Sequence, residues 1–492
     1  MADERRIVVI GSGPTGAAAA RELVQRGMPV TMLESGTGFQ AGLLLKIGGK
    51  NLLRRQPALG EDGGHAVTGD PETLCYVKHA LGGLSNNWTG AVPRFAAGDF
   101  TEGERLHERY RWPIGYDELV PFYETVERYM DISADDRDVP QLPSGHVTFA
   151  RTLPADWHGV ERVAVSRGQG FTVYPLADGP PNLLAARGTA FNSYSAVIRP
   201  LLRAANFELK TGAHALQLEW SQAKGRIGAV VYHDRRTGLT ERIAADAIVV
   251  ACGPLGTTKL LHNSTSATFA HGLGNSRGLL GKYLHDHPRE WWSFTMERPL
   301  SLLTPSAHLT RLPYASSTPL IACSWTLGVA NVRDRILSRF NVKGREVGVQ
   351  LIGTMIPTEA NHALPSITRN DEFGLPVLEV CIRYSTEEID NMVRSREHLL
   401  ELLDEAGCEG TPDAIDPTLY PGTVAHYGGT ARMHASPEHG VVDAWNRVYD
   451  APNVLVCDAA CFTTAVEKNP TLTAMAIAAR AAQRLVHDLQ HG

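Results

Sequence analysis

Short apolar runs and glycine-rich turns alternate along the first part of the chain. Ile7 to Ile10 is apolar at every position, which is typical of a strand buried on both faces of a parallel sheet. The turn GSGPTG follows, and the next segment contains Ala17 to Ala20, which would keep a helix slim. A second apolar run ends at Glu34. The pattern predicts a strand, a tight turn, a helix and a second strand.

Similar segments return later in the chain. Residues 247–261, AIVVACGPLGTTKLL, combine a buried strand, a Gly-Pro turn and the start of a helix, and residues 207–220 alternate like strands. Near the end, the strand VLVC leads into an alanine-rich helix. Together these segments predict one parallel α/β unit that is assembled discontinuously, from residues 1–100, 190–290 and 420–492.

The two remaining segments have a different pattern. Residues 101–189 contain Pro and Gly clusters and one amphipathic helix, YDELVPFYETVERYM. Residues 291–419 carry alternating runs such as PLIACSWTLGV, VGVQLIGTMI and VLEVCIRY, which predict antiparallel strands, followed by a surface helix that ends near Gly407. We therefore expect an α/β (α+β) protein whose second domain, with its connecting segments, is built on an antiparallel sheet from these two regions.

Composition narrows the class of protein. The chain has 492 residues, of which 43% are hydrophobic and 20% charged, as is ordinary for a soluble enzyme of about two to four domains. The formal charge of −6, with a pI near 6.3 and no basic stripe, argues against a nucleic-acid partner. The apolar stretches are too short or too interrupted to predict a membrane span.

Cysteine usage and the start of the chain favour a reduced, cytoplasmic protein. The seven cysteines are scattered, with no CxxC pair, and the spacing of Cys457 and Cys461 matches no zinc pattern. His285 and His287 flank Asp286, but a structural turn explains that stretch better than a metal site does, so we expect no metal. No basic and apolar leader precedes the first strand.

The first turn has the spacing of a dinucleotide-binding fingerprint. Gly11 would permit the sharp turn, Gly13 would let a pyrophosphate approach the backbone, and Gly16 would let the helix pack close to the strand. The helix N-terminus would then face the phosphates. Glu34, 23 positions after Gly11, would accept from the ribose hydroxyls and would repel the extra phosphate of NADP. This segment predicts a Rossmann-like domain but leaves NAD and FAD both open.

Four further segments resemble those of the glucose–methanol–choline (GMC) oxidoreductases. They are LGGLSNNWTG (81–90), GLLGKYLHDHP (278–288), HYGGTARM (426–433) and the block VLVCDAACFTTAVEKNPTLTAMAIAARAA (454–482). With the fingerprint, they span nearly the whole chain in the family's order, apart from about 290–420. The resemblance implies bound FAD and oxidation of an alcohol by hydride transfer to flavin N5.

The loop SNNWTG looks closest to the S-T-H-W-T loop of pyranose oxidases, in which the histidine is joined covalently to FAD. Asn87 stands at that position, and an amide cannot make this bond, so we expect FAD to be noncovalent. Thr89 aligns with a threonine near flavin N5 and O4. Taken without the family, Asn86 and Asn87 would be read as a plain polar turn.

The resemblance implies further contacts to the cofactor. It places the backbone of Ala213 to Ala215 at the adenine, and Asp458 and Ala459 beside the ribityl chain and pyrophosphate. Asp458 could equally cap the turn before the last helix. The fingerprint and the resemblance together assign to FAD the residues Gly11, Gly13, Pro14, Thr15, Gly16, Glu34, Ser85, Asn86, Asn87, Thr89, Ala213, His214, Ala215, Gly253, Asp458, Ala459, Asn469, Pro470 and Thr471.

A histidine and an asparagine near the C-terminus have the chemistry that alcohol oxidation requires. The hydroxyl proton must leave to a base, and a neutral imidazole suits this task near neutral pH. An uncharged amide donor can hold the substrate oxygen and stabilise the developing alkoxide. In the family's pattern these are His426 and Asn469, where many members carry a second histidine in place of the asparagine. The alternative for His426 is a loop histidine satisfied by backbone.

The sequence indicates the type of reaction more clearly than it indicates the substrate. The S-x-x-W-T loop and the His/Asn pair favour a sugar, glycoside or other polyol, with an aminoglycoside-type amino sugar as one candidate. Trp291, Trp292 and Glu290 are candidate pocket residues by position only, and core packing of the tryptophans is an equal alternative. The partners expected are a small-molecule alcohol and an electron acceptor, either O2 or another carrier.

Three alternatives stay open. Some GMC proteins are lyases that cleave cyanohydrins without redox turnover. The chain could also be an oxidase of a non-sugar alcohol. Without the resemblance, an NAD-binding or nonenzymatic Rossmann protein would also fit the fingerprint.

Overall fold

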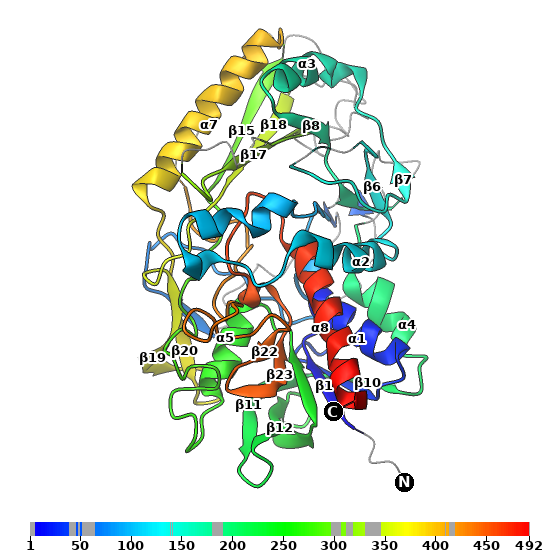
Figure 1. The fold of residues 1–492 in the computed structure, drawn as a ribbon, viewed down its shortest axis with the longest axis vertical. Coiled ribbons are helices and arrows are strands. Elements are labelled where there is room, and N and C mark those ends of the chain that lie inside the picture. The colour runs from blue at the N-terminus through cyan, green and yellow to red at the C-terminus, as the bar shows by residue number, and fades with distance from the viewer. Residues whose placement is uncertain are drawn as a thin grey trace.

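Two six-stranded sheets, one mainly parallel and one antiparallel, organise the described part of the chain (Figure 1). The computed structural model describes residues 5–38, 46–47, 50–51, 64–137, 139, 141–179, 190–296, 307–310, 318–329, 346–408, 410–412 and 419–491. In Figure 1 the antiparallel sheet occupies the upper part of the molecule, and the parallel sheet with the two chain ends lies below it. The two halves share one chain that passes between them several times.

The parallel sheet begins with the first strand of the chain at its centre. Its order is β10 (Phe207–Thr211), β2 (Val30–Glu34), β1 (Ile7–Ile10), β14 (Ala247–Val250), β23 (Ala451–Val456) and β22 (Arg447–Val448), the last antiparallel to its neighbour. Ile7 pairs with Val30 on one side and Ala247 on the other. Strand β1 therefore has β2 as its neighbour on one side and β14 on the other. The strand order reverses at this place, which creates a switch point at the carboxyl ends of β1 and β14.

Helices with small side chains pack closely against this sheet. The helices of this half are α1 (Pro14–Gln25), α2 (Tyr116–Glu127), α4 (Arg199–Leu201), α5 (Pro254–Asn263) and α8 (Thr471–His491). Helix α8 packs against both α1 and α2 (Figure 1). The fully buried Ala17 to Ala20 let α1 approach its neighbours, as the sequence predicts. The strand, turn, helix and strand expected at the start of the chain are all present.

The other described strands form four smaller sheets. They are formed by β11 (Ala213–Ser221), β12 (Arg226–Asp234) and β13 (Leu239–Ala244); by β19 (His362–Asn370), β20 (Pro376–Cys381) and β5 (His65–Val67); by β7 (Phe149–Ala150), β6 (Ile132–Ala134) and β9 (Leu176–Ala177); and by the pair β3 (Lys46–Ile47) and β4 (Lys50–Asn51). Helix α5 packs against β11 and against the β19–β20 hairpin, which joins these additions to the main sheet.

The antiparallel sheet has one apolar face and one polar face. Its order is β21 (Gly410–Pro412), β15 (Arg289–Met296), β18 (Glu346–Gly353), β17 (Cys323–Val329), β16 (Ala307–Thr310) and β8 (Gly170–Val173). Trp292, Trp325 and Leu351 from alternate positions form a buried cluster with α3 (His158–Ser166) and α7 (Thr386–Glu405). The opposite side chains face away from these helices, because successive residues of a strand point to opposite faces.

The expected fold class is confirmed, with a parallel α/β unit and an antiparallel sheet. Strand β8, from residues 101–189, pairs with β16, from residues 291–419. The domain boundaries themselves stay a prediction. No helix in the described ranges has the length and apolar character that a membrane crossing needs.

Candidate active site

The turn after β1 is tightly packed on one side and open on the other. Gly11 has φ +102°, and a Cβ there would lie 2.2 Å from the carbonyl oxygen of Ala251. A Cβ on Gly16 would lie 2.1 Å from the carbonyl oxygen of Gly11, so the helix packs directly on the turn. Gly13, at the N-cap of α1, has no neighbouring atom within 4 Å of a Cβ. The open position lies at a helix N-terminus, where a pyrophosphate fits.

Glu34 joins this turn to the GG-x-S loop. Its carboxylate accepts hydrogen bonds from the backbone N–H of Ser12 at 3.1 Å and of Gly36 at 2.7 Å, and from the Ser12 hydroxyl. The Ser12 oxygen in turn accepts from the backbone N–H of Gly82 at 3.0 Å. Burial raises the pKa of Glu34, although these hydrogen bonds act against the rise. Glu34 therefore lies at the carboxyl end of β2, where the fingerprint predicts it.

The GG-x-S loop uses most of its polar groups internally. The Ser85 hydroxyl donates to the Gly82 carbonyl at 2.5 Å, and the Asn86 amide donates to Leu81 at 2.9 Å and to Gly83 at 2.8 Å. For Asn86 this is the polar-turn role that the sequence left open. Asn87 differs, because its Oδ1 is buried and has no hydrogen-bond partner in the described part of the chain. Thr89 is exposed.

Asp458 connects two turns at the carboxyl end of the parallel sheet. Its Oδ2 accepts from the Gly253 backbone N–H at 3.0 Å and from the Thr257 hydroxyl at 2.5 Å, and its Oδ1 accepts from the Ala460 N–H at 2.9 Å. Burial raises its pKa to about 6. These hydrogen bonds correspond to the capping alternative stated for Asp458. They also hold the turns of Gly253 and Ala459 close to each other at the switch point.

His214 lies near the end of β2, beside the residue that follows Glu34. Its Nδ1 is 2.8 Å from the Ser35 hydroxyl, and its ring stacks on Phe373 with 4.9 Å between the ring centroids. Burial lowers the pKa of His214 to about 3, so the imidazole is neutral at pH 7. Ala213, which starts β11, is buried, and Ala215 is partly buried. The segment predicted for the adenine therefore lies at the same sheet edge as Glu34.

His426 and Asn469, 43 positions apart, are in direct contact. The Nε2 of His426 lies 3.1 Å from the Nδ2 of Asn469. Asn469 precedes Pro470 and Thr471, where helix α8 begins. Its side-chain oxygen accepts a hydrogen bond from the hydroxyl of Tyr174. The two side chains therefore converge on one place, and a small molecule there would meet both of them.

The imidazole of His426 is neutral. The ring of His287 lies edge-on to it, with 5.0 Å between the ring centroids. Burial, and then electrostatic interactions with His287 and Arg289, hold the pKa of His426 well below its ordinary value. Its Nδ1 is buried and has no hydrogen-bond partner in the described residues. His426 therefore does not match the alternative of a loop histidine whose ring nitrogens are hydrogen-bonded to the backbone.

Asp286 anchors the loop that carries His426. Its Oδ1 accepts from the His426 backbone N–H at 2.8 Å, and the backbone N–H groups of His287 and Val424 also donate to its carboxylate. Burial raises its pKa to about 7, against these hydrogen bonds. His285 Nδ1 lies 3.2 Å from the Tyr283 carbonyl. The LHDHP stretch thus acts as a structural turn, and in the described ranges no three metal-ligating side chains gather.

A buried ion cluster supports the segment that leads to Asn469. The ammonium of Lys468, which is 0% exposed, lies 2.8 Å from the Asp99 carboxylate and 2.9 Å from that of Glu467. Burial acts to lower the pKa of Lys468, but the two carboxylates outweigh it and the pKa is raised. The Ser324 hydroxyl of β17 donates to the Glu467 carbonyl at 2.9 Å. The polar face of the antiparallel sheet therefore packs onto this segment.

The three candidate substrate residues on β15 separate between the two faces of the sheet. Trp292 is 3% exposed in the apolar cluster against α7, and Glu290, on the same face, forms an ion pair with Arg396 of α7. This placement favours the packing alternative for Trp292 and gives Glu290 a partner on the helix. Trp291 is 52% exposed and lies on the other face. Cross-strand pairing aligns it with Gln350, and Gln350 with Thr326.

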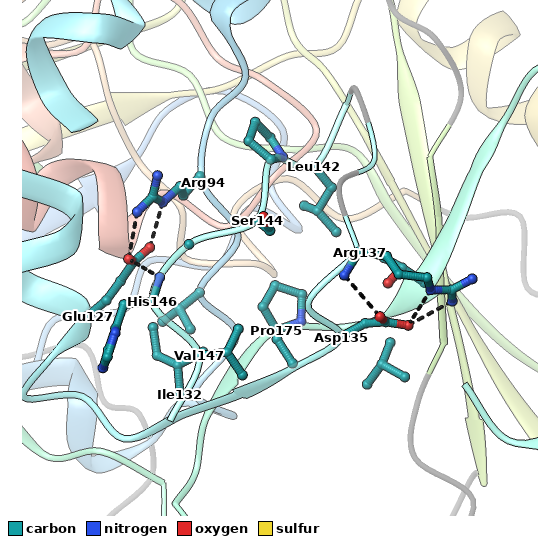
Figure 2. A pocket seen from close by; sticks show the side chains of 16 residues that line it. Arg94, Glu127, Ile132, Asp135, Arg137, Leu142, Ser144, His146, Val147 and Pro175 are labelled. Carbon is teal, nitrogen blue, oxygen red and sulfur yellow. Dashed lines mark hydrogen bonds and ion pairs between the residues drawn. The ribbon is translucent and has the colours of Figure 1, made fainter. Parts of the chain in front are cut away.

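A pocket lies beside β8, at the other end of the strand order from β15 (Figure 2). Thr172 and Val173 of β8 contribute to its lining, with Pro175. Its charged side chains are already paired, since Arg94 lies 2.6 Å from Glu127, and Arg137 lies 2.7 Å from Asp135, as Figure 2 shows. The pocket is lined by none of the residues predicted for the reaction, so we assign it no part in the chemistry.

Tyr174, His287 and the Lys468 cluster were not identified as site residues from the sequence. Tyr174 lies in a loop-rich segment and is 295 positions from Asn469, so no local pattern marks it. His287 stands in the LHDHP stretch, and the resemblance of that stretch to the family's motif is the signal that could have found it. The contact of Lys468 with Asp99 spans 369 positions.

Comparison with known proteins identifies the family. Two family models described as GMC oxidoreductase match residues 57–289 and 366–478. The chain is 28% identical to 6'''-hydroxyparomomycin C oxidase of Streptomyces lividus, over 98% of this chain and 91% of that protein. It is 27% identical to 2-methyl-1,2-propanediol dehydrogenase of Mycolicibacterium austroafricanum, over 98% of this chain and 95% of that protein.

A solved structure has the same fold. An FAD-dependent oxidoreductase from Chaetomium thermophilum matches with a TM-score of 0.69 and 15% identity, over 99% of this chain and 100% of that one. The chain belongs to the GMC oxidoreductase family, as its sequence motifs predict. It is accordingly a flavin-dependent enzyme that acts on alcohol groups.

Proposed function

We propose that the protein oxidises a hydroxyl group of a sugar-like alcohol, with His426 as the base and Asn469 as the hydrogen-bond donor. The observation that carries the proposal is the 3.1 Å contact between His426 Nε2 and Asn469 Nδ2. FAD, when bound, supplies the oxidising power by accepting the hydride. A substrate oxygen within hydrogen-bond distance of both nitrogens would meet one proton acceptor and one donor.

The surroundings of His426 suit the role of a base. The lowered pKa keeps the imidazole neutral and able to accept the hydroxyl proton. The uncharged amide of Asn469 would hold the oxygen and stabilise the negative charge that develops as the proton leaves. Asp286 holds the His426 backbone, which keeps the imidazole in place before the substrate arrives. Each of the two groups would contribute about two to four powers of ten in rate.

We propose that FAD is held noncovalently across the carboxyl ends of β1 and β2. The open side of Gly13 leaves space for the pyrophosphate, and the buried, unpartnered Oδ1 of Asn87 is an acceptor that bound FAD could satisfy. An amide at position 87 cannot form the covalent bond of the histidine it replaces. Acid precipitation should therefore release all of the flavin into solution, and yellow colour retained in the pellet would contradict this part of the proposal.

A sugar-like substrate fits the polar face of the antiparallel sheet. Trp291, Gln350 and Thr326 align across three strands, and all three side chains are at least partly exposed. An aromatic ring with neighbouring hydrogen-bonding groups is a combination that suits a hydroxylated ring. The relative from Streptomyces lividus acts on hydroxyparomomycin C, which supports an amino sugar, whereas the propanediol dehydrogenase supports a small diol.

The decisive experiment follows flavin absorbance without oxygen against a panel of sugars, amino sugars and small diols. We expect one of the sugar classes to reduce the flavin fastest. His426→Ala should keep FAD and slow that reduction by at least about a hundredfold. The matched control is His262→Ala, which removes another buried histidine, from α5.

Three outcomes would contradict the proposal. Wild-type rates in His426→Ala would remove the base role. Product formed while the flavin stays oxidised would favour a lyase. Reduction by diols alone would leave the reaction but replace the substrate class.

A further inference from the structure

Tyr174 connects the antiparallel half of the molecule to the proposed catalytic pair. It follows β8 directly, is 7% exposed, and packs with Ala91 and Leu176. Its hydroxyl donates a hydrogen bond to the side-chain oxygen of Asn469. The amide nitrogen at the other end of the same group faces His426. Tyr174, Asn469 and His426 therefore form a continuous chain of hydrogen bonds.

The direction in which these hydrogen bonds run, from donor to acceptor, matters for the chemistry. A carboxamide has an acceptor at one end and donors at the other, and the two ends exchange when the group rotates by half a turn. When the oxygen faces Tyr174, the NH2 group faces His426 Nε2 and must find an acceptor there. A neutral imidazole accepts only at the nitrogen that carries no proton. Nε2 therefore carries no proton and accepts from the amide, and an unprotonated Nε2 is the state that a base requires.

The reversed amide would give the opposite state. Its oxygen would face Nε2 and favour a proton there, and it would also face the substrate oxygen with an acceptor in place of a donor. Tyr174 keeps its donor hydrogen, because burial and then the negative charge of Glu467 raise the pKa of the phenol. A protonated phenol favours the amide oxygen as its partner.

We propose that Tyr174 is a positioning residue, whose hydroxyl orients the amide of Asn469 and thereby selects the reactive tautomer of His426. This inference rests on the function proposed above for the two side chains. The competing explanation is structural, since a buried tyrosine hydroxyl usually needs some hydrogen-bond partner. The two explanations differ in whether loss of the hydroxyl affects the reaction or only the stability of the fold.

The test is Tyr174→Phe, with flavin reduction measured anaerobically and expressed per bound flavin. Loss of one hydrogen bond to the amide should slow reduction about five- to tenfold, while the substrate Kd changes by less than about twofold. The matched control is Tyr123→Phe. Tyr123 is fully buried, and its hydroxyl lies 2.8 Å from the hydroxyl of Thr473, on the helix that follows Asn469. That variant should reduce its flavin at the wild-type rate.

A double-mutant comparison shows whether Tyr174 acts through Asn469. In an Asn469→Ala background, Tyr174→Phe should add less than about a twofold effect, because the group it orients is gone. A full additional loss in that background would overturn the inference. So would wild-type rates in Tyr174→Phe, equal losses in both tyrosine variants, or loss of FAD in Tyr174→Phe alone. If His426→Ala also reduces flavin normally, the proposed function fails as well; if only Tyr174→Phe does, the positioning role alone is wrong.

Discussion

The two large sheets contribute to the site in different ways. The central strands β1 and β14 of the parallel sheet are apolar and buried at every position, and the features that we propose to bind the cofactor lie in the turns that follow β1, β14 and β23. These features are mostly backbone: an open glycine, helix N-termini and N–H groups held by Asp458. The antiparallel sheet is apolar on one face only, and it contributes side chains from the other.

The comparison predicts that the two halves tolerate substitutions differently. The turns that we propose to hold the cofactor consist mainly of backbone and depend on glycines and tight packing. Nearly any side chain added to these turns is therefore expected to be harmful. A polar sheet face tolerates exchange of its side chains, because their removal leaves the apolar face intact. The proposed catalytic pair lies where the halves meet, since His426 and Asn469 come from loops of the parallel half and Tyr174 directly follows β8 of the antiparallel sheet.

The largest expected effect comes from substitutions in the glycine turn after β1. Gly11→Ala would place a Cβ 2.2 Å from the Ala251 carbonyl oxygen at φ +102°, so we expect no soluble, FAD-containing protein. Gly13→Ala is the matched control, since its Cβ would meet no protein atom within 4 Å. That variant should fold but lose at least about tenfold in FAD affinity, because a methyl group would occupy the side that the pyrophosphate approaches. Soluble yellow Gly11→Ala protein would show that the turn is less constrained than its packing indicates.

A pair of tryptophan variants tests the two faces of the antiparallel sheet. Trp292→Ala should lower the free energy of unfolding by about 3–5 kcal/mol, because it opens a cavity between β15 and α7. Trp291→Ala should change it by less than about 1 kcal/mol but weaken substrate binding in an anaerobic titration. Denaturant unfolding measures the first quantity. Equal destabilisation by both substitutions would argue against an accessible polar face.

The smallest expected effect is the pH dependence, which tests how well the antiparallel half covers His426. An ordinary histidine has a pKa of about 6.5, and that of His426 is well below it. The neutral base is present above its pKa and is lost as the pH falls through it. The rate of flavin reduction should therefore stay level as the pH falls from about 8 through about 6.5, the range in which an ordinary histidine would become protonated. A half-maximal rate near pH 6.5 would indicate an imidazole that is exposed to water.

Much of the parallel half was predictable because its constraints are local. The GSGPTG turn requires glycine at defined positions, and the apolar strands and small helix residues around it are read within one short segment. His426 and Asn469 were found through motifs, and the structure brings the two side chains into contact. The same motifs could not separate the roles of Asn86 and Asn87, which differ only in which polar atoms the folded loop leaves without a partner.

The arrangement of the antiparallel half was decided only by tertiary structure. Alternation along β15 puts Trp291 and Trp292 on opposite faces, but the sequence does not say which face receives the helices. That choice depends on the packing of α3 and α7, and the alignment of Trp291 with Gln350 and Thr326 depends on strand register.

The sequence by itself determined the class of fold and the glycine turn of the fingerprint, because short-range spacing sets both, and it indicated the proposed catalytic pair through its resemblance to the family's motifs. Tertiary structure decided how Tyr174 meets Asn469 and how Asp99 meets Lys468, across 295 and 369 positions. Such contacts arise when distant segments are buried together and their polar groups must find partners, and no local pattern records which partners those will be.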